Sequence, residues 1–144
     1  MIEFRGKSVK TNKWTFGSLI KLGDGYVIAN SSEIVGSTSS DDIAVSFSES
    51  EIDVVWPESV GQFIGRKDNK LTKIFDGDII TVNGHYPKLV KFIPERAAFC
   101  LANICDFKNQ DLWDIWQTPY SSWWDEMNIE VIGNKIDNPE LLEK

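Results

Sequence analysis

The sequence predicts a mainly β protein, with an N-terminal β-hairpin subdomain at residues 1–56 and a small barrel or roll at residues 57–144. Short segments in which apolar and polar side chains alternate recur along the chain, which is typical of strands with one buried face. Turns rich in glycine and asparagine separate these segments. The apolar content of 42% is that of a globular chain, and 144 residues are enough to bury a core without disulfide staples.

The N-terminal subdomain is predicted from one hairpin and two later strands. Its strands are expected at residues 14–22, 26–29, 43–48 and 52–56. The hairpin turn is Gly23-Asp24-Gly25, because glycine readily adopts the positive φ that tight turns need. The serine-rich residues 30–42 are expected to form a loop. Pro57 ends the last strand, since proline cannot continue a ladder of hydrogen bonds.

The C-terminal region contains denser strand signals with tight turns. Strands are expected at residues 60–64, 71–75, 78–82, 89–93, 97–104 and 129–132. Asn83-Gly84 is a strong hairpin signal, since a type I′ turn requires positive φ at both central positions. A charged turn is expected at 67–70, and a short helix begins at Asn138. Short strands joined by tight turns predict a small barrel or roll with short helical segments.

A tryptophan-rich insertion at about residues 106–128 interrupts this rhythm. Asp111 is expected to cap a short helix that runs through Trp116 and stops before a proline. Trp113 and Trp116 are three residues apart, so on this helix they share one face. A face with two indole rings is costly to leave in water, and we therefore expect both rings to pack inward.

Five blocks of sequence together form a recognisable pattern. They are Arg5-Gly6-Lys7, Pro57 to Asp68, Ile74 to Ile80, Glu130 to Asn134, and Asn138 to Leu142. In their order and spacing these blocks resemble the YopX family of phage and prophage proteins, and they bracket nearly the whole chain. The resemblance implies an SH3-like roll in the C-terminal part and a phage or prophage origin. It implies no activity and supplies no catalytic residues.

One position departs from that family pattern. The family usually has Asn-Gly in the charged turn, where this chain has Asn69-Lys70. Lysine at positive φ is costly, so a turn of another type is expected here. The tryptophan-rich insertion is also outside the pattern. The barrel prediction does not depend on either difference.

The charge of the chain restricts its partners. A formal charge of -7 argues against nonspecific nucleic-acid binding, which needs many Lys and Arg side chains on phosphates. No apolar run approaches the roughly 20 residues that cross a bilayer, and residues 1–5 are followed by no apolar signal segment. Together with the phage origin that the resemblance implies, these features lead us to expect a protein of the bacterial host cytoplasm that does not contact the membrane.

The sequence contains no recognisable catalytic or metal-binding pattern. His85 is the one histidine, and it follows a hairpin turn where side chains are usually exposed. Asp76 and Asp78 are interpreted as turn residues, because no third ligand has a useful spacing. Cys100 and Cys105 lack the C-x-x-C spacing of a redox or zinc site and are expected to be free thiols. We expect neither an enzyme nor a bound cofactor.

The leading hypothesis is a noncatalytic accessory protein that acts through protein contacts, with a partner protein or with further copies of itself. Its candidate interaction surface is the tryptophan cluster Trp113, Trp116, Trp123 and Trp124. Tryptophan is enriched both in cores and at the centres of interfaces. Trp123 and Trp124 are adjacent, so on an extended segment at least one of them faces an exposed edge or an interface.

The alternative hypothesis is a nucleic-acid-binding accessory protein. Its candidate patch is Arg66, Lys67, Lys70 and Lys73, together with the basic N-terminus at residues 1–21. Small β-barrels bind single strands through basic loops and aromatic platforms. Clustering of these side chains on one face would favour this alternative, despite the negative charge of the whole chain.

Overall fold

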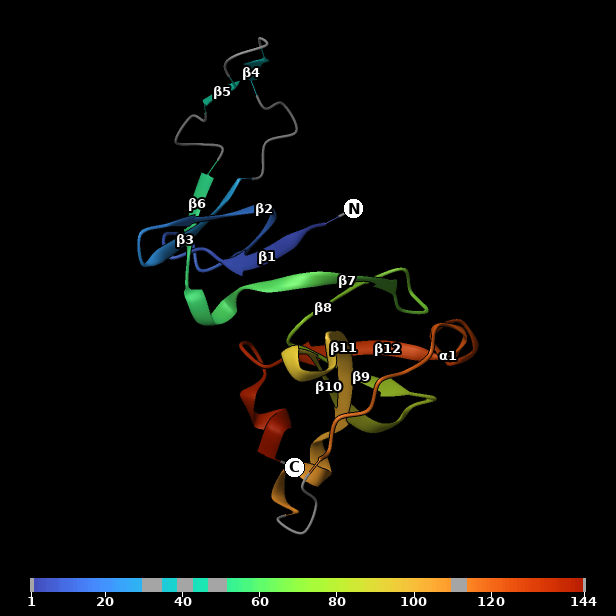
Figure 1. The fold of residues 1–144 in the computed structure, drawn as a ribbon. Coiled ribbons are helices and arrows are strands. Elements are labelled where there is room, and N and C mark those ends of the chain that lie inside the picture. The colour runs from blue at the N-terminus through green and yellow to red at the C-terminus, as the bar shows by residue number, and fades with distance from the viewer. Residues whose placement is uncertain (1, 30–34, 39–42, 47–51, 110–113, 144) are drawn as a thin grey trace. The chain divides into compact units, whose positions relative to one another are not determined.

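The computed structural model describes residues 2–29, 35–38, 43–46, 52–109 and 114–143 (Figure 1). The chain divides into two compact units, unit 1 at Met1–Gln62 and unit 2 at Phe63–Lys144. Both units are built mainly from antiparallel strands, so the predicted mainly β class is confirmed. The SH3-like description of the C-terminal part and a subdomain boundary after residue 56 stay predictions.

Unit 1 is a twisted antiparallel sheet. Its elements are β1 (Phe4–Lys7), β2 (Trp14–Leu22), β3 (Gly25–Ala29), β4 (Val35–Thr38), β5 (Ile43–Ser46), β6 (Ile52–Val55) and the 3₁₀ helix η1 (Pro57–Ser59). The main sheet has the order β6-β3-β2-β1, and Gly61 and Gln62, which begin β7 (Gly61–Lys67), pair with β1. The predicted hairpin is β2 and β3, which turn around Gly23 at φ 59°.

The prediction of a loop throughout residues 30–42 is wrong for the part that the structure describes. Strand β4 pairs with β5, with Val35 opposite Ser46 and Thr38 opposite Ile43. The pairing uses backbone groups, so small polar side chains do not prevent it. The serine-rich composition therefore led to a loop prediction where the chain forms a strand. Residues 30–34 and 39–42 lie outside the described residues.

The core of unit 1 forms where β1 and β6 approach closely. Ile28 and Val55 are almost completely buried. A Cβ atom added at Gly6 would lie 2.8 Å from Cβ of Val55, so only glycine fits this position without movement of its neighbours. Arg5, the residue before Gly6, is 9% exposed, and its guanidinium lies 4.6 Å from the ring centroid of Trp14. Arg5 therefore belongs to the packed sheet.

Unit 2 contains a four-stranded sheet with helical segments on both faces. Its elements after β7 are β8 (Lys73–Phe75), β9 (Asp78–Val82), β10 (His85–Ile93), η2 (Pro94–Arg96), β11 (Ala98–Asn103), η3 (Ile104–Lys108), α1 (Ser121–Glu126), β12 (Ile129–Asn134) and η4 (Pro139–Glu143). The sheet order is β11-β10-β9-β12, and β7 pairs with β8. Asn83 and Gly84 have φ of 54° and 77°, so the predicted turn between β9 and β10 is confirmed.

Both faces of this sheet are buried. Ile80 and Val90 belong to one apolar cluster, against which Trp123 and Trp124 pack. Ile79 and Leu89, their neighbours in sequence, belong to a second cluster. Adjacent residues of a strand point to opposite faces, so the two clusters lie on opposite sides of β9 and β10. Trp116, Leu141 and Leu142 cover the second cluster.

The charged turn at 67–70 is held by a buried carboxylate. One oxygen of Asp68 accepts the backbone N–H groups of Lys70 and Thr72 at 2.9 and 2.8 Å. Its other oxygen accepts the N–H of Val131 in β12 at 3.0 Å. Leu71, not Lys70, has the positive φ, at 64°. The turn is thus fastened to β12, which explains why Asp68 is only 5% exposed.

Candidate functional site

A strap of extended chain, residues 114–120, lies along the outer edge of β11. The N–H of Leu101 donates to the carbonyl of Gln117 at 2.9 Å, and the N–H of Gln117 donates back at 2.8 Å. Pro119 follows closely and has no N–H, so the pairing cannot continue through it as a regular strand. The result is a short antiparallel contact that fixes the position of the strap on the sheet.

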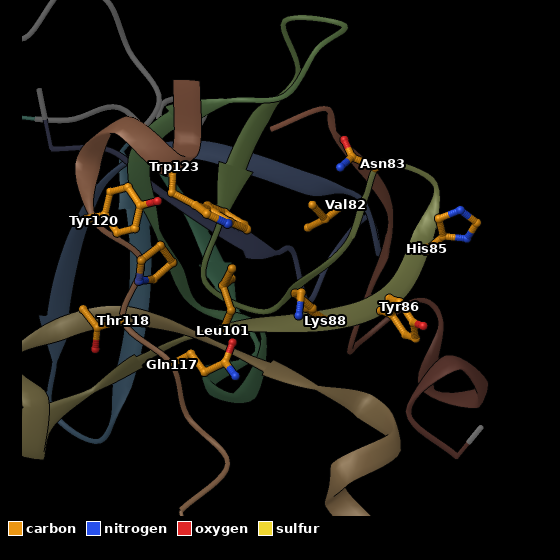
Figure 2. A pocket seen from close by; sticks show the side chains of 11 residues that line it. Val82, Asn83, His85, Tyr86, Lys88, Leu101, Gln117, Thr118, Tyr120 and Trp123 are labelled. Carbon is orange, nitrogen blue, oxygen red and sulfur yellow. The ribbon is translucent and has the colours of Figure 1, made fainter. Parts of the chain in front are cut away.

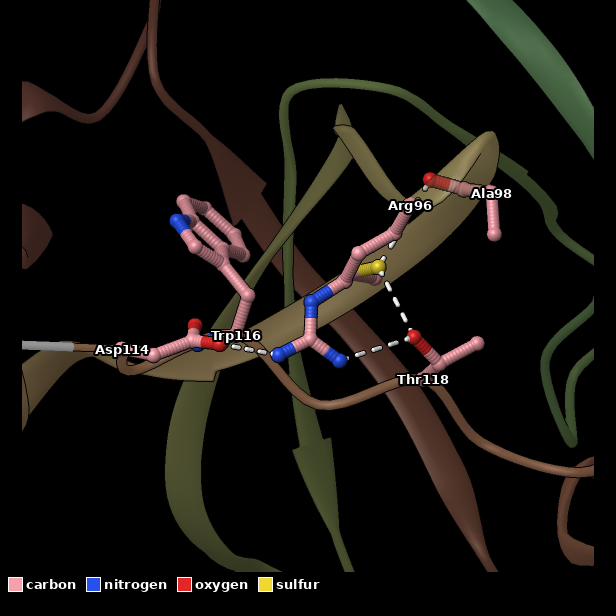
Figure 3. Close-up of polar contacts among 6 residues, drawn as sticks. Arg96, Ala98, Asp114, Trp116 and Thr118 are labelled. Carbon is pink, nitrogen blue, oxygen red and sulfur yellow. Dashed lines mark hydrogen bonds and ion pairs between the residues drawn. The ribbon is translucent and has the colours of Figure 1, made fainter. Parts of the chain in front are cut away.

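Side chains fasten the strap at both ends (Figure 3). Arg96 forms an ion pair with Asp114, and its other terminal nitrogen donates to Oγ1 of Thr118 at 3.4 Å. Sγ of the buried Cys100 lies 3.3 Å from the same Thr118 oxygen. The N–H of Trp116 donates to the Asp114 carboxylate, which together with Arg96 lowers the pKa of Asp114.

The helix expected at 111–116 is wrong for its described residues. Residues 114–116 form no helix or other regular element, while 111–113, including Trp113, lie outside the described residues. The Asp114 side chain accepts the N–H of Trp116, a local bond that competes with helical pairing. Trp116 nevertheless packs inward against the second apolar cluster, with its ring 6.4 Å from that of Phe107.

Trp123 and Trp124 lie on helix α1 and not on an extended segment. Neighbouring side chains on a helix are separated by about 100°, so both rings can contact the same sheet face. Both are half-buried against the first apolar cluster, and their rings meet edge to face with centroids 5.2 Å apart. The expectation of an extended segment at these two residues is therefore wrong, while a role of either ring at an exposed edge or an interface stays a prediction.

The strap separates two hollows in the surface of unit 2. The larger, here called the strap hollow, has a volume of about 470 Å³, and the smaller one about 340 Å³. Thr118 and Pro119 line both hollows. Trp123 lines the strap hollow and Trp124 the smaller one. The two adjacent tryptophans thus each contribute one edge to a different depression.

The strap hollow has aromatic residues on two sides and a mixture of apolar and polar residues between them. Figure 2 shows Tyr120 and Trp123 on one side, His85 and Tyr86 on the other, and Lys88 between them. The aromatic rims are open to solvent, with Tyr120 65% and Tyr86 72% exposed. The side-chain amides of Asn83 and Gln117 also line the hollow. This combination of exposed rings and amides is suited to binding a mixed polar and apolar ligand.

The cationic residue in this hollow is Lys88, on β10. It is half-buried and donates a hydrogen bond to the side-chain oxygen of Asn103. Burial lowers the pKa of Lys88, although the charges of Asp106 and Cys105 act in the opposite direction. The side chain is therefore held in the hollow at some cost in hydration.

Two of the four basic residues of the alternative patch pair with carboxylates, and the patch stays a prediction. Arg66 pairs with Asp125 at 2.9 Å, and Lys70 pairs with Glu130 at 2.7 Å. Lys73 lies 5.5 Å from the ring centroid of Phe63, and Lys67 is exposed on β7. Asp125 lies 59 residues after Arg66 in the sequence, and Glu130 lies 60 residues after Lys70.

The remaining candidates for chemistry are turn residues or exposed. His85 is exposed beside Tyr86, with ring centroids 6.2 Å apart. Asp78 accepts the N–H of Phe75 at 2.8 Å, and Asp76 accepts the N–H of Phe92 at 2.7 Å. Within the described ranges, no three His, Cys, Asp or Glu side chains are grouped to hold a metal ion. No described helix is both long and apolar enough to span a membrane.

The two cysteines should differ strongly in reactivity. Cys100 is buried behind the strap, whereas Cys105 is exposed in η3. We expect a thiol reagent to modify one cysteine quickly in the folded protein and the second only after unfolding, because reaction requires access to the sulfur. Counting reacted thiols over time, with and without denaturant, is the measurement. A single thiol in the unfolded chain, or two equal rates in the folded chain, would contradict this expectation.

Comparison with known proteins places the chain in a family. The sequence profile of a family described as YopX protein matches residues 3–143. A search of curated proteins finds no match. Among solved structures, protein EF1440 from Enterococcus faecalis has a similar fold, with a TM-score of 0.56 and 19% sequence identity, over 99% of this chain and 98% of that one. Since the family match covers nearly its full length, the chain belongs to the YopX family.

Proposed function

We propose that this chain is a noncatalytic accessory protein, of phage or prophage origin, that binds a segment of a partner protein in the bacterial cytoplasm. The observation that supports this function is the strap hollow, which places Trp123, Tyr120 and Tyr86 around one depression. Exposed aromatic side chains gathered around a depression are typical of sites that bind other proteins.

The size and lining of the hollow are compatible with an extended peptide segment. Its volume of about 470 Å³ is within the range of small binding sites. The amides of Asn83 and Gln117 can donate to and accept from a peptide backbone. Tyr86 and Tyr120 line the hollow from opposite sides, so a segment that crosses it passes both residues. The volume, the amides and the two tyrosines can all contribute to binding a peptide, and none of them requires a catalysed reaction.

Selection of peptides from a random library against the wild-type protein tests this function. Peptides that bind the strap hollow should lose affinity at least about tenfold for the double variant Tyr86→Ala/Tyr120→Ala, because the contact area of two rings is removed. Both rings are mostly exposed, so the double variant should keep its melting temperature. Phe16→Ala, an exposed aromatic residue of unit 1, is the matched control.

Failure to enrich any peptide, or equal affinity for wild type and the double variant, would overturn the proposed function. Light scattering of the free protein addresses self-association separately. A concentration-dependent dimer that disappears in the double variant would identify a second copy as the occupant of the hollow, in place of a different protein.

Nucleic-acid binding is expected to be weak. The ion pairs Arg66–Asp125 and Lys70–Glu130 place carboxylates where phosphates would need to lie. With a net charge of -7 in addition, we expect no micromolar binding of labelled single- or double-stranded oligonucleotides at physiological salt. Fluorescence anisotropy is the measurement, and the variant Asp125→Asn/Glu130→Gln is the control that releases both cations. Micromolar wild-type binding that weakens steeply with salt would support the alternative.

A further inference from the structure

The strap hollow differs in charge from the rest of the chain. The whole sequence has 22 acidic residues against 15 basic ones. None of the 11 described residues that line the hollow is acidic. Lys88 and His85 are its basic members. In so acidic a chain, a depression lined by cationic and neutral groups is complementary to an anion.

Lys88 is also bonded differently from three other cations of unit 2. Arg66, Lys70 and Arg96 each contact a carboxylate directly. Lys88 instead donates to the amide oxygen of Asn103, whose amide nitrogen lies 3.4 Å from the carboxylate of Asp106. An ammonium group carries three donors, and the amide accepts one of them. The charge of Lys88 is thus positioned by a neutral group.

The position of Lys88 places this charge beside an apolar surface. Lys88 lies two residues before Val90 on β10, on the sheet face against which Trp123 packs. Leu101 and Val82 line the same hollow. The burial that lowers the pKa of Lys88 disfavours its charged form, and a bound anion would offset this cost.

We propose that Lys88 binds a carboxylate of the partner segment, next to an apolar side chain that packs on Trp123 and Tyr120. This inference rests on the proposed function. A carboxylate can come from an acidic side chain within the segment or from the free C-terminus of the partner. Both sources present the same planar anion, which accepts hydrogen bonds from an ammonium group.

Two peptide libraries distinguish these sources. One displays internal random segments, and the other displays segments that end in a free carboxylate. Enrichment of Asp or Glu in the first library identifies a side-chain carboxylate. Enrichment only in the second, lost when the selected peptides are synthesised as C-terminal amides, identifies the chain terminus.

Variants of two lysines on the same strand then test the role of Lys88. Lys88→Met should weaken the selected peptides about tenfold, while replacement of the peptide carboxylate by an amide should have a similar effect on wild type and little effect on the variant. Lys91→Met makes the same change of charge on the opposite face of β10 and should leave affinity unchanged. Thermal melting confirms that both variants fold, and Lys88→Gln replaces Lys88→Met if that variant does not.

The outcomes separate this inference from the proposed function. If peptides bind, and lose affinity in Tyr86→Ala/Tyr120→Ala, but show no preference for a carboxylate, the role of Lys88 is overturned and the proposed function stands. Equal effects of Lys88→Met and Lys91→Met also overturn it, because they would report only the net charge. If no peptide is enriched from either library, both proposals fail.

Discussion

Replacement of Asp68 by alanine is expected to lower the free energy of unfolding of unit 2 by about 3 kcal/mol or more. The substitution leaves the N–H groups of Lys70, Thr72 and Val131 without their acceptor. Each buried N–H left unpaired costs about 1–3 kcal/mol, and water that reaches the turn reduces the sum. Asp68→Asn should cost less, because the amide retains one oxygen acceptor.

The same carboxylate should make stability depend on acid. Burial raises the pKa of Asp68, but the hydrogen bonds from the N–H groups of Val131, Thr72 and Lys70 outweigh it and bring the pKa below its ordinary value of 3.8. A carboxyl group whose pKa is lower in the folded state stabilises the fold above its unfolded pKa. This contribution is complete near neutral pH and is lost as the pH falls below about 4. Asp68→Asn should remove that part of the acid dependence.

Chemical denaturation at neutral pH and at pH 3 measures both effects. The control is Asp125→Ala, which removes an exposed partner of Arg66, with 70% of its side chain accessible to solvent. Surface ion pairs contribute about 0–1 kcal/mol, so this variant should unfold nearly like wild type. Equal destabilisation by Asp68→Ala and Asp125→Ala would show that the buried carboxylate does not hold the turn.

Gly6→Ala is expected to destabilise unit 1 by about 1–3 kcal/mol through overpacking. The new Cβ would lie 2.8 Å from Cβ of Val55 and 2.9 Å from each of its methyl carbons. Val55 is 1% exposed, so it has little space into which to move. Gly25→Ala is the matched control in the same sheet, because its Cβ would meet only the carbonyl of Leu22, at 3.7 Å.

A double variant shows whether the collision is the cause. Val55→Ala alone leaves a cavity and is destabilising. If the two side chains collide, Gly6→Ala/Val55→Ala should cost clearly less than the sum of the single variants. Denaturant unfolding of the four proteins supplies this comparison. Strict additivity would mean that Gly6→Ala acts elsewhere in the sheet.

The sequence predicts those elements of the fold that local chemistry determines. A type I′ turn requires positive φ at both central positions, and Asn83 and Gly84, which adopt positive φ readily, form the turn between β9 and β10. Residues 78–82 alternate too little to identify a buried face, yet their bounding turns delimit β9 correctly. The segment at 114–120 could not be predicted in this way, because its conformation depends on Arg96 and on the edge of β11.

The candidate site was only partly predictable for a related reason. Trp123 was identified from its unusual local density of tryptophans, whereas Lys88, Tyr86 and Tyr120 have no distinguishing local pattern. They meet because β10 and the strap are neighbours in space. Conversely, the basic run around 66–73 looks like a patch in sequence, but carboxylates from α1 and β12 pair with two of its members.

The way in which the sheet of unit 2 ends has a consequence for the protein at high concentration. The outer edge of β11 is hydrogen-bonded to Gln117 through Leu101. The outer edge of β12 is hydrogen-bonded to Asp68, which accepts the N–H of Val131, and to Asn69, whose N–H donates to the carbonyl of Ile129. Open strand edges are the templates from which cross-β fibrils grow. Because the middle of each outer strand of this sheet is already bonded within the chain, strands of a neighbouring copy find few backbone groups to extend the ladder. Crowded copies of unit 2 should therefore resist fibril formation until the strap or the Asp68 turn detaches.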